Sequence, residues 1–154
     1  RPTGYYNAKA RKLKALARFL ITNFEGDPAN MAAVPTPRLR EMLLGVHGVG
    51  EETADDILLY AAGKPVFVID AYTRRLAGRL GLADGGESYG QLSTKFADAS
   101  PRQSPGTNDA GVMGEYHALI VRHAKEACRK APLCGRCVLR DLCPTGASAR
   151  AAPG

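Results

Sequence analysis

The stretch LLGVHGVGEETADDILLY, Leu43 to Tyr60, decides the fold. It has two helix-like halves around the turn 47–50, which contains too much glycine for ordinary helix. Two glycines let a tight turn expose successive backbone N–H groups at the start of the next helix, where an anion is favoured. The pattern predicts a phosphate-binding hairpin, with a plain helical corner as the alternative. The residues expected to contact the phosphate are His47, Gly48, Val49, Gly50 and Thr53.

Two acids, Glu51 and Glu52, follow this turn in a chain whose net charge is +6. Acids suit a helix N-terminus, because the helix macrodipole favours negative charge there. The positive charge of the whole chain favours an anionic partner, nucleic acid first, although a basic protein without such a partner fits the charge equally well. No apolar run approaches the roughly 18 residues that a membrane helix needs, so no membrane partner is expected.

The rest of the chain reads as helices joined by connectors, which predicts an all-α fold. At 154 residues, 45% of them hydrophobic, the chain is long enough for one domain with its own core. The apolar run Val66–Ile69 is too short and isolated for a sheet, so we interpret it as an extended connector to Asp70, the expected N-cap of the next helix. Thr36 is the expected N-cap of the helix before the hairpin, and Leu119 is expected in the core. The predicted helices are 7–24, 37–44, 51–62, 71–80, 92–97 and 116–130, with a flexible loop over 100–111 and a disordered tail over 145–154.

Four cysteines lie together near the C-terminus, at Cys128, Cys134, Cys137 and Cys143. A secreted disulfide scaffold would usually spread its bridges along the chain, so this clustering suggests a local metal site in a reducing compartment. Four thiolates in the pattern C-x5-C-x2-C-x5-C can hold a tetrahedral zinc ion or a 4Fe–4S cluster. The spacing alone leaves both open.

Several segments together resemble the helix–hairpin–helix DNA glycosylase superfamily, and within it the endonuclease III family. They are GYYNAKA at 4–10, GVHGVGEETADDIL at 45–58, FVIDAYTRRL at 67–76, EYHALIVRHAKEAC at 115–128, and the cysteine array. The resemblance runs from Gly4 to about Pro144 and is weak only over 84–114. Helices that precede these segments in family members have no counterpart here, so the fold is expected to be partial, with its N-terminal part missing.

The resemblance implies that Asp70 carries the fixed aspartate of the family. A carboxylate there would stabilise the positive charge on the sugar when an N-glycosidic bond breaks, or deprotonate water. Bifunctional members have a lysine two positions after the second hairpin glycine; here that position is Glu52, which cannot form an imine. The run G-x-G-x-E-T-A-D at 48–55 is also similar to the 3-methyladenine DNA glycosylase III branch. The expected function is therefore monofunctional base excision repair of alkylated purines, with a bifunctional glycosylase/AP lyase for oxidised pyrimidines and a non-catalytic DNA-binding module as alternatives.

The same resemblance implies a 4Fe–4S cluster on the four cysteines, although the family has six residues rather than five in the first gap; zinc is the alternative. Arg129 and Lys130 in this loop are expected to contact the DNA backbone, since clustered positive charge binds phosphate. The implied organisation is a helical barrel domain over 1–114, with the hairpin unit at about 37–62, followed by a C-terminal helix and cluster loop over 115–144. The expected partner is double-stranded DNA with a damaged base. A monomer in the bacterial or archaeal cytoplasm, associated with the nucleoid, is expected.

Overall fold

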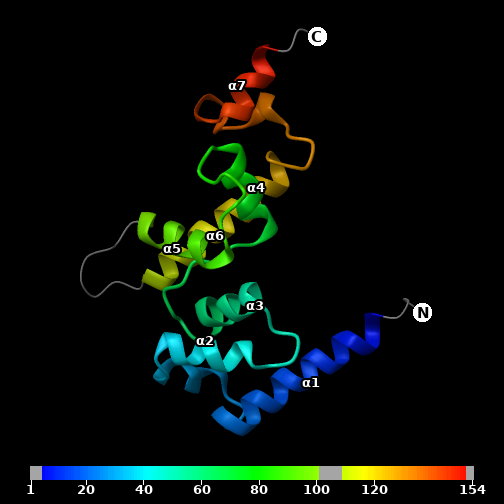
Figure 1. The fold of residues 1–154 in the computed structure, drawn as a ribbon, viewed down its shortest axis with the longest axis vertical. Coiled ribbons are helices and arrows are strands. Elements are labelled where there is room, and N and C mark those ends of the chain that lie inside the picture. The colour runs from blue at the N-terminus through cyan, green and yellow to red at the C-terminus, as the bar shows by residue number, and fades with distance from the viewer. Residues whose placement is uncertain (1–4, 101–108, 152–154) are drawn as a thin grey trace.

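The computed structural model describes residues 5–100 and 109–151, which form helices and connectors and no strand. The expected all-α class is confirmed for this part of the chain. In Figure 1, α1, α2 and α3 lie toward one end of an elongated molecule and α7 lies at the other, with α4, α5 and α6 between them. No helix in the described ranges has the length and apolarity needed to cross a membrane. The elements are α1 (Tyr5–Phe24), η1 (Pro28–Ala33), α2 (Thr36–Leu44), α3 (Glu51–Asp56), the π-helix η2 (Ile57–Ala61), α4 (Ala71–Arg79), α5 (Tyr89–Ala99), α6 (Asp109–Glu126), η3 (Cys134–Arg136), η4 (Arg140–Leu142) and α7 (Pro144–Ala151).

Two hydrophobic clusters hold the helices together, and η2 takes part in both. The hairpin cluster consists of Phe24, Met31, Leu39, Leu43, Ala54, Leu58 and Ala62. The central cluster consists of Leu59, Phe67, Val68, Ile69, Tyr89, Leu92, Ala110 and Met113. Leu58 and Leu59 are consecutive, yet they belong to different clusters, and Val66 packs against both. Since burying one leucine contributes about 1.5–3 kcal/mol, η2 and the connector after it bind the hairpin unit firmly to the rest.

The hairpin between α2 and α3 is a tight turn that only glycine can close without strain. Gly48 has a φ of +87°, in the left-handed region. The backbone N–H of Val49 donates to the carbonyl of Val46 at 3.0 Å, and that of Ala54 donates to Gly50 at 2.8 Å. Gly50 is the N-cap of α3. The N–H groups at the start of α3 therefore follow directly on the turn, as the sequence predicted.

An ion pair between α2 and α3 fixes the angle of the hairpin. Nε of Arg40 lies 2.7 Å from Oδ1 of Asp55, whose side chain is 3% exposed. Nη2 of Arg40 also lies 3.5 Å from Oε1 of Glu51, at the first turn of α3. A buried carboxylate is stable only with such a partner, so this pair couples the two helices on either side of the turn.

Most predicted helices are present, although their ends differ. The connector over 66–69 is extended, and Asp70 caps α4 as predicted. The prediction that Thr36 is an N-cap is wrong: Thr36 is already helical, Pro35 occupies the cap position, and no side chain caps α2. The helix predicted over 51–62 is present, and within it the chain changes from α to π geometry after α3.

In the C-terminal half, α6 begins earlier and ends earlier than predicted. It runs over Asp109–Glu126 rather than 116–130, so the loop prediction over 100–111 is wrong for its last three residues. Residues 101–108 of that predicted loop lie outside the described residues. Leu119, expected in the core, is 50% exposed, because it lies on the outer side of α6.

The tail predicted as disordered over 145–154 is helical as far as Ala151, since it forms α7. Its last three residues lie outside the described ranges. Gly146 explains the close packing of α7 on η4: a Cβ at this glycine would come within 2.7 Å of the carbonyl oxygen of Arg140. The small residues that suggested disorder therefore include one that permits contact between two elements.

Candidate functional site

The carboxylate of Asp70 stands at the end of the buried connector and is fixed from two sides. The three residues before it, Phe67 to Ile69, are at most 1% exposed. Its Oδ1 accepts a hydrogen bond from the backbone N–H of Thr73 at 2.7 Å, the expected N-cap contact. Its Oδ2 lies 3.6 Å from Nε2 of His117 in α6, and the Asp70 side chain is 13% exposed. The carboxylate is therefore mostly buried but still reachable from outside.

The sequence did not single out His117, which is 8% exposed in the middle of α6. Its Nδ1 lies 2.7 Å from the hydroxyl of Tyr60 in η2, and the same hydroxyl lies 3.3 Å from the carbonyl oxygen of Gly114. Its Nε2 is buried, has no hydrogen-bond partner within bonding distance, and is the atom that faces Asp70. The only sequence signal is a histidine on the inner side of a helix, which does not distinguish a site residue from an ordinary core residue.

The surroundings of Asp70 favour its charged form. Burial by itself would raise the pKa of Asp70, but the contacts with His117 and with the N–H of Thr73 stabilise the anion and outweigh burial. The net result is a pKa below the ordinary aspartate value. Asp70 is thus a carboxylate throughout the neutral pH range.

Two other acids, Glu52 and Asp56, lie near enough to Asp70 for the charges of the three carboxylates to influence one another. Burial raises the pKa of Glu52, and the charges of Asp70 and Asp56 raise it further. Burial also raises the pKa of Asp56, and the charge of Asp70 raises it further. The structure therefore brings Glu52 and Asp70, the two residues that the sequence indicated, into electrostatic contact.

The other residues expected to contact phosphate lie on the outside of the hairpin. His47, Gly48, Gly50 and Thr53 are exposed, whereas Val49 is partly buried and packs against the hairpin cluster. A cation lies beside this turn, because the side chain of Lys12 in α1 runs over it: a Cβ at Gly48 would come within 2.3 Å of Cγ of Lys12. The hairpin thus offers exposed backbone groups with a lysine next to them.

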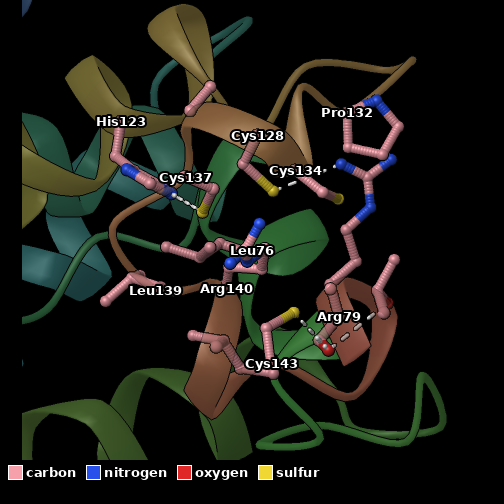
Figure 2. Close-up of a pocket in the computed structure, with 14 residues that line it drawn as sticks. Leu76, Arg79, His123, Cys128, Pro132, Cys134, Cys137, Leu139, Arg140 and Cys143 are labelled. Atoms are coloured by element: carbon pink, nitrogen blue, oxygen red, sulfur yellow. Dashed lines mark hydrogen bonds between the residues drawn. The ribbon is translucent and has the colours of Figure 1, made fainter. Parts of the chain in front are cut away.

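The four cysteines line one pocket between α4, α6 and the C-terminal loop, and Figure 2 shows them around it. Sγ of Cys128 accepts a hydrogen bond from Nη1 of Arg79 at 3.2 Å, and Sγ of Cys143 donates to the Arg79 carbonyl at 3.2 Å. Sγ of Cys137 lies 3.5 Å from Nε2 of His123. None of the four is in a disulfide. The thiols and their neighbours are therefore arranged about a common space.

Four thiols around one pocket are a donor set that fits a thiolate-bound metal group. Zinc would require four donors around one point at about 2.3 Å from each sulfur. A 4Fe–4S cluster binds each thiolate at a different iron, so its ligands stand further apart around a shared space. Pocket-lining residues such as Leu76 and Leu139 would shield such a cluster from water.

α4 also holds the cysteine loop at the end opposite its N-cap. Arg79 donates to the carbonyl oxygens of Arg129 at 2.6 Å and Lys130 at 2.8 Å. Arg75 donates from Nε to the carbonyl oxygen of Cys128 at 2.9 Å. Arg129 and Lys130 are themselves exposed. Their backbones are thus fixed, Nε of Arg129 also donates to the carbonyl oxygen of Lys125 at 2.8 Å, and both side chains still lie on the surface.

The family pattern of HhH-GPD superfamily base excision DNA repair proteins matches residues 1–102. The chain belongs to this superfamily. Among its HhH-GPD relatives, a provisionally named DNA repair glycosylase of Methanocaldococcus jannaschii is 42% identical over 145 residues, which cover 93% of this chain and 63% of the relative. Endonuclease III of Sulfolobus acidocaldarius is 28% identical over 144 residues, which cover 93% of this chain and 59% of the relative.

A solved structure of a non-covalent endonuclease III–DNA complex has the same fold, with a TM-score of 0.72 and 25% identity. The match covers 97% of this chain and 63% of that chain. The expected helix–hairpin–helix glycosylase fold is therefore confirmed for this HhH-GPD chain, which spans about three fifths of the length of the relatives it matches.

Proposed function

We propose that this HhH-GPD protein is a DNA glycosylase that hydrolyses the N-glycosidic bond of a damaged base. One observation carries the proposal: the carboxylate of Asp70 is held as an anion at the edge of an apolar wall, and the helix that follows the glycine hairpin supplies a second acid beside it. Membership of a superfamily of base excision DNA repair proteins supports the same function.

In the proposed reaction, the bond between the sugar C1′ and the base nitrogen breaks, and its electron pair leaves with the base. Positive charge then develops on the sugar, where the Asp70 carboxylate stabilises it. Water adds to C1′ and gives up a proton to Asp70, leaving a free base and an abasic site. Both roles need the charged carboxylate, and the contacts that lower the pKa of Asp70 keep it charged at neutral pH.

Glu52 favours this hydrolytic reaction over strand cleavage. A lyase needs an amine that attacks C1′ and forms a Schiff base, which a carboxylate cannot do. Lys64, the next lysine along the chain, donates from Nζ to the carbonyl oxygen of Ala32 at 2.7 Å. Because this contact holds the amine against η1, we expect a monofunctional enzyme.

The negative charge of these three neighbouring carboxylates favours a positively charged base as the substrate. An alkylated purine such as 3-methyladenine carries a positive charge while it is attached to the sugar, so Glu52, Asp56 and Asp70 would attract it there, whereas a neutral oxidised pyrimidine gains nothing from them. A cationic base also leaves with less assistance than a neutral one. The similarity of the run at 48–55 to the 3-methyladenine DNA glycosylase III branch supports the same substrate class.

DNA would be held at two places while the damaged nucleotide is flipped toward Asp70. The backbone N–H groups of the hairpin would bind phosphate at one place, and Arg129 and Lys130 at the other. A 4Fe–4S cluster, when bound, supplies a covalent cross-link that fixes the shape of this basic loop. Its expected ligands are Cys128, Cys134, Cys137 and Cys143.

Replacing Asp70 by asparagine in the full-length protein tests the proposal. Asparagine caps a helix as well as aspartate does, so α4 should persist, while base release should fall by at least about 100-fold with little change in DNA affinity. The matched control is Asp27→Asn, because Asp27 is also an N-cap aspartate, accepting from Ala29 N at 2.8 Å, but belongs to η1. Base release by Asp70→Asn at the parent rate would refute the role of Asp70.

A panel of duplexes carrying alkylated, oxidised or deaminated bases separates the alternatives. Release of alkylated purines without strand nicking, and without an adduct trapped by borohydride, would support the monofunctional proposal. Nicking with a trapped adduct would indicate the bifunctional enzyme for oxidised pyrimidines. Binding of DNA without release of any base would indicate the non-catalytic module.

A further inference from the structure

We propose that Tyr60 and His117 are positioning residues for Asp70. The hydroxyl of Tyr60 fixes His117 in the tautomer that carries its proton on Nε2, and this N–H orients Oδ2 of Asp70. The inference rests on the proposed function, since it concerns the carboxylate of that reaction. It also makes a claim about the imidazole ring that is measurable without any substrate.

The Tyr60 hydroxyl lies within hydrogen-bond distance of two acceptors, Nδ1 of His117 and the carbonyl oxygen of Gly114. A tyrosine hydroxyl has one proton to donate. Its distance to Nδ1 of His117 is 2.7 Å, typical of a strong hydrogen bond, whereas its distance to the carbonyl oxygen of Gly114 is 3.3 Å, longer than the usual range. The shorter contact favours donation to Nδ1, which then carries no proton. A neutral imidazole that accepts at Nδ1 carries its proton on Nε2.

The resulting N–H points at Asp70. Nε2 of His117 is buried and has no other hydrogen-bond partner, and Oδ2 of Asp70 lies 3.6 Å away. This distance exceeds a hydrogen bond, as contacts of catalytic groups often do in a free enzyme before substrate closes the site. Because Oδ1 already accepts from Thr73, a closer His117 would fix both oxygens and so set the plane of the carboxylate.

The π geometry of η2 accounts for the reach of Tyr60. The N–H of Ala62 donates to the carbonyl of Ile57, five residues back, at 3.0 Å. In this widened turn Leu59 is 4% exposed and belongs to the central cluster. The next residue, Tyr60, contacts His117 in α6. Tyr60 is 56% exposed although its hydroxyl is bound. Single π turns inside helices are rare and occur frequently at functional sites.

Nitrogen NMR of the histidine rings in the full-length protein, at a pH slightly above neutral, tests the tautomer. The chain has 3 histidines, and the signal missing from His117→Gln assigns this one. We expect the Nε2–H form in the parent and a mixture of both tautomers in Tyr60→Phe. An Nδ1–H ring or an imidazolium in the parent would overturn the inference, as would an unchanged tautomer in Tyr60→Phe.

Single-turnover base release tests the positioning role. Tyr60→Phe should slow release about tenfold without changing DNA affinity, since it removes one oriented contact. Tyr116→Phe is the matched control, because it removes a hydroxyl from a residue that is 42% exposed on the same helix as His117. A rate in Tyr60→Phe equal to that in Tyr116→Phe would contradict the role.

A second pair of variants separates positioning from packing. Glutamine at position 117 can donate an amide N–H to Oδ2 of Asp70, whereas leucine cannot. His117→Gln should therefore keep more of the rate than His117→Leu, and equal losses in both would overturn the inference. Absence of base release in the parent would refute the proposed function and the positioning role with it, while the NMR result would still decide the tautomer independently.

Discussion

Replacing Gly48 by alanine should damage the hairpin through the backbone. Gly48 has a φ of +87°, and a left-handed conformation costs an L-residue about 1–2 kcal/mol. The new Cβ would also come within 2.3 Å of Cγ of Lys12. Because the lysine side chain is exposed and flexible, it can swing away, so the backbone cost should dominate. We therefore expect the free energy of unfolding to fall by about 1–2 kcal/mol.

Gly50, two residues further, is the matched control. Its φ of −100° and ψ of −178° are extended, and no atom lies within 4 Å of a Cβ built on it. Serine is also a preferred N-cap residue, and Gly50 is the N-cap of α3. Gly50→Ser should therefore leave the free energy of unfolding unchanged or raise it. The two variants separate a demand for left-handed backbone from a mere preference for small residues.

Thermal unfolding followed by circular dichroism measures both effects. A loss of 1–2 kcal/mol corresponds to a melting temperature lower by about 2–8 °C in a chain of this size. Gly48→Ala should cost the same in a Lys12→Ala background, within about 0.5 kcal/mol, if the lysine only moves aside. Equal losses at the two glycines, or no loss in Gly48→Ala, would refute the reasoning.

Three further predictions concern the ion pair of Arg40, the carboxylate of Asp56 and the cysteines. Arg40→Met should lower the free energy of unfolding by about 3 kcal/mol, because it leaves the carboxylate of Asp55, whose side chain is 3% exposed, without its cationic partner. Arg38→Met should cost at most about 1 kcal/mol, because the Arg38 side chain in its ion pair is 64% exposed. Urea unfolding of the two variants compares these losses. Asp56→Asn should raise the melting temperature at about pH 7 and much less at about pH 4. The pKa of Asp56 in the folded protein lies above the ordinary 3.8, so the folded protein binds the proton more tightly than the unfolded chain does. The stability of the parent therefore falls as pH rises from 3.8 through the folded-state pKa, and asparagine removes this loss. An equal gain at both pH values would contradict this. Purified protein should be brown and contain iron and sulfide in equal amounts, Cys137→Ser should lose both, and a colourless zinc-loaded protein would overturn the cluster.

The hairpin and Asp70 were predictable because local chemistry sets both. A left-handed residue such as Gly48 is marked by glycine itself, and an N-cap such as Asp70 is marked by a short polar side chain at a helix start. The gathering of the four cysteines around one pocket was predictable for the same reason, since their spacing along a short loop limits how far apart they can lie. In each case the relevant atoms are within a few residues of one another.

The contact between Tyr60 and His117 was not predictable, because it depends on packing over a long distance in sequence. The two residues are 57 positions apart. They meet only because η2 adopts π geometry and α6 lies against it. Neither condition has a residue pattern of its own, and the run after Asp56 reads as ordinary helix. Sequence reasoning therefore found the carboxylate but missed the groups that orient it.

The two acids after the hairpin act on different sides of α3, although they are neighbours. Successive residues of a helix point about 100° apart, because a turn takes 3.6 residues. Glu51 is 3.5 Å from Arg40 and so belongs to the hairpin's ion pair. Glu52 instead lies on the exposed surface, where partial burial and the charge of Asp70 raise its pKa, so its charged form is disfavoured there. An acid kept where its charged form is disfavoured is better explained by a ligand than by packing. A positively charged base beside Asp70 is a ligand that would favour the charged form.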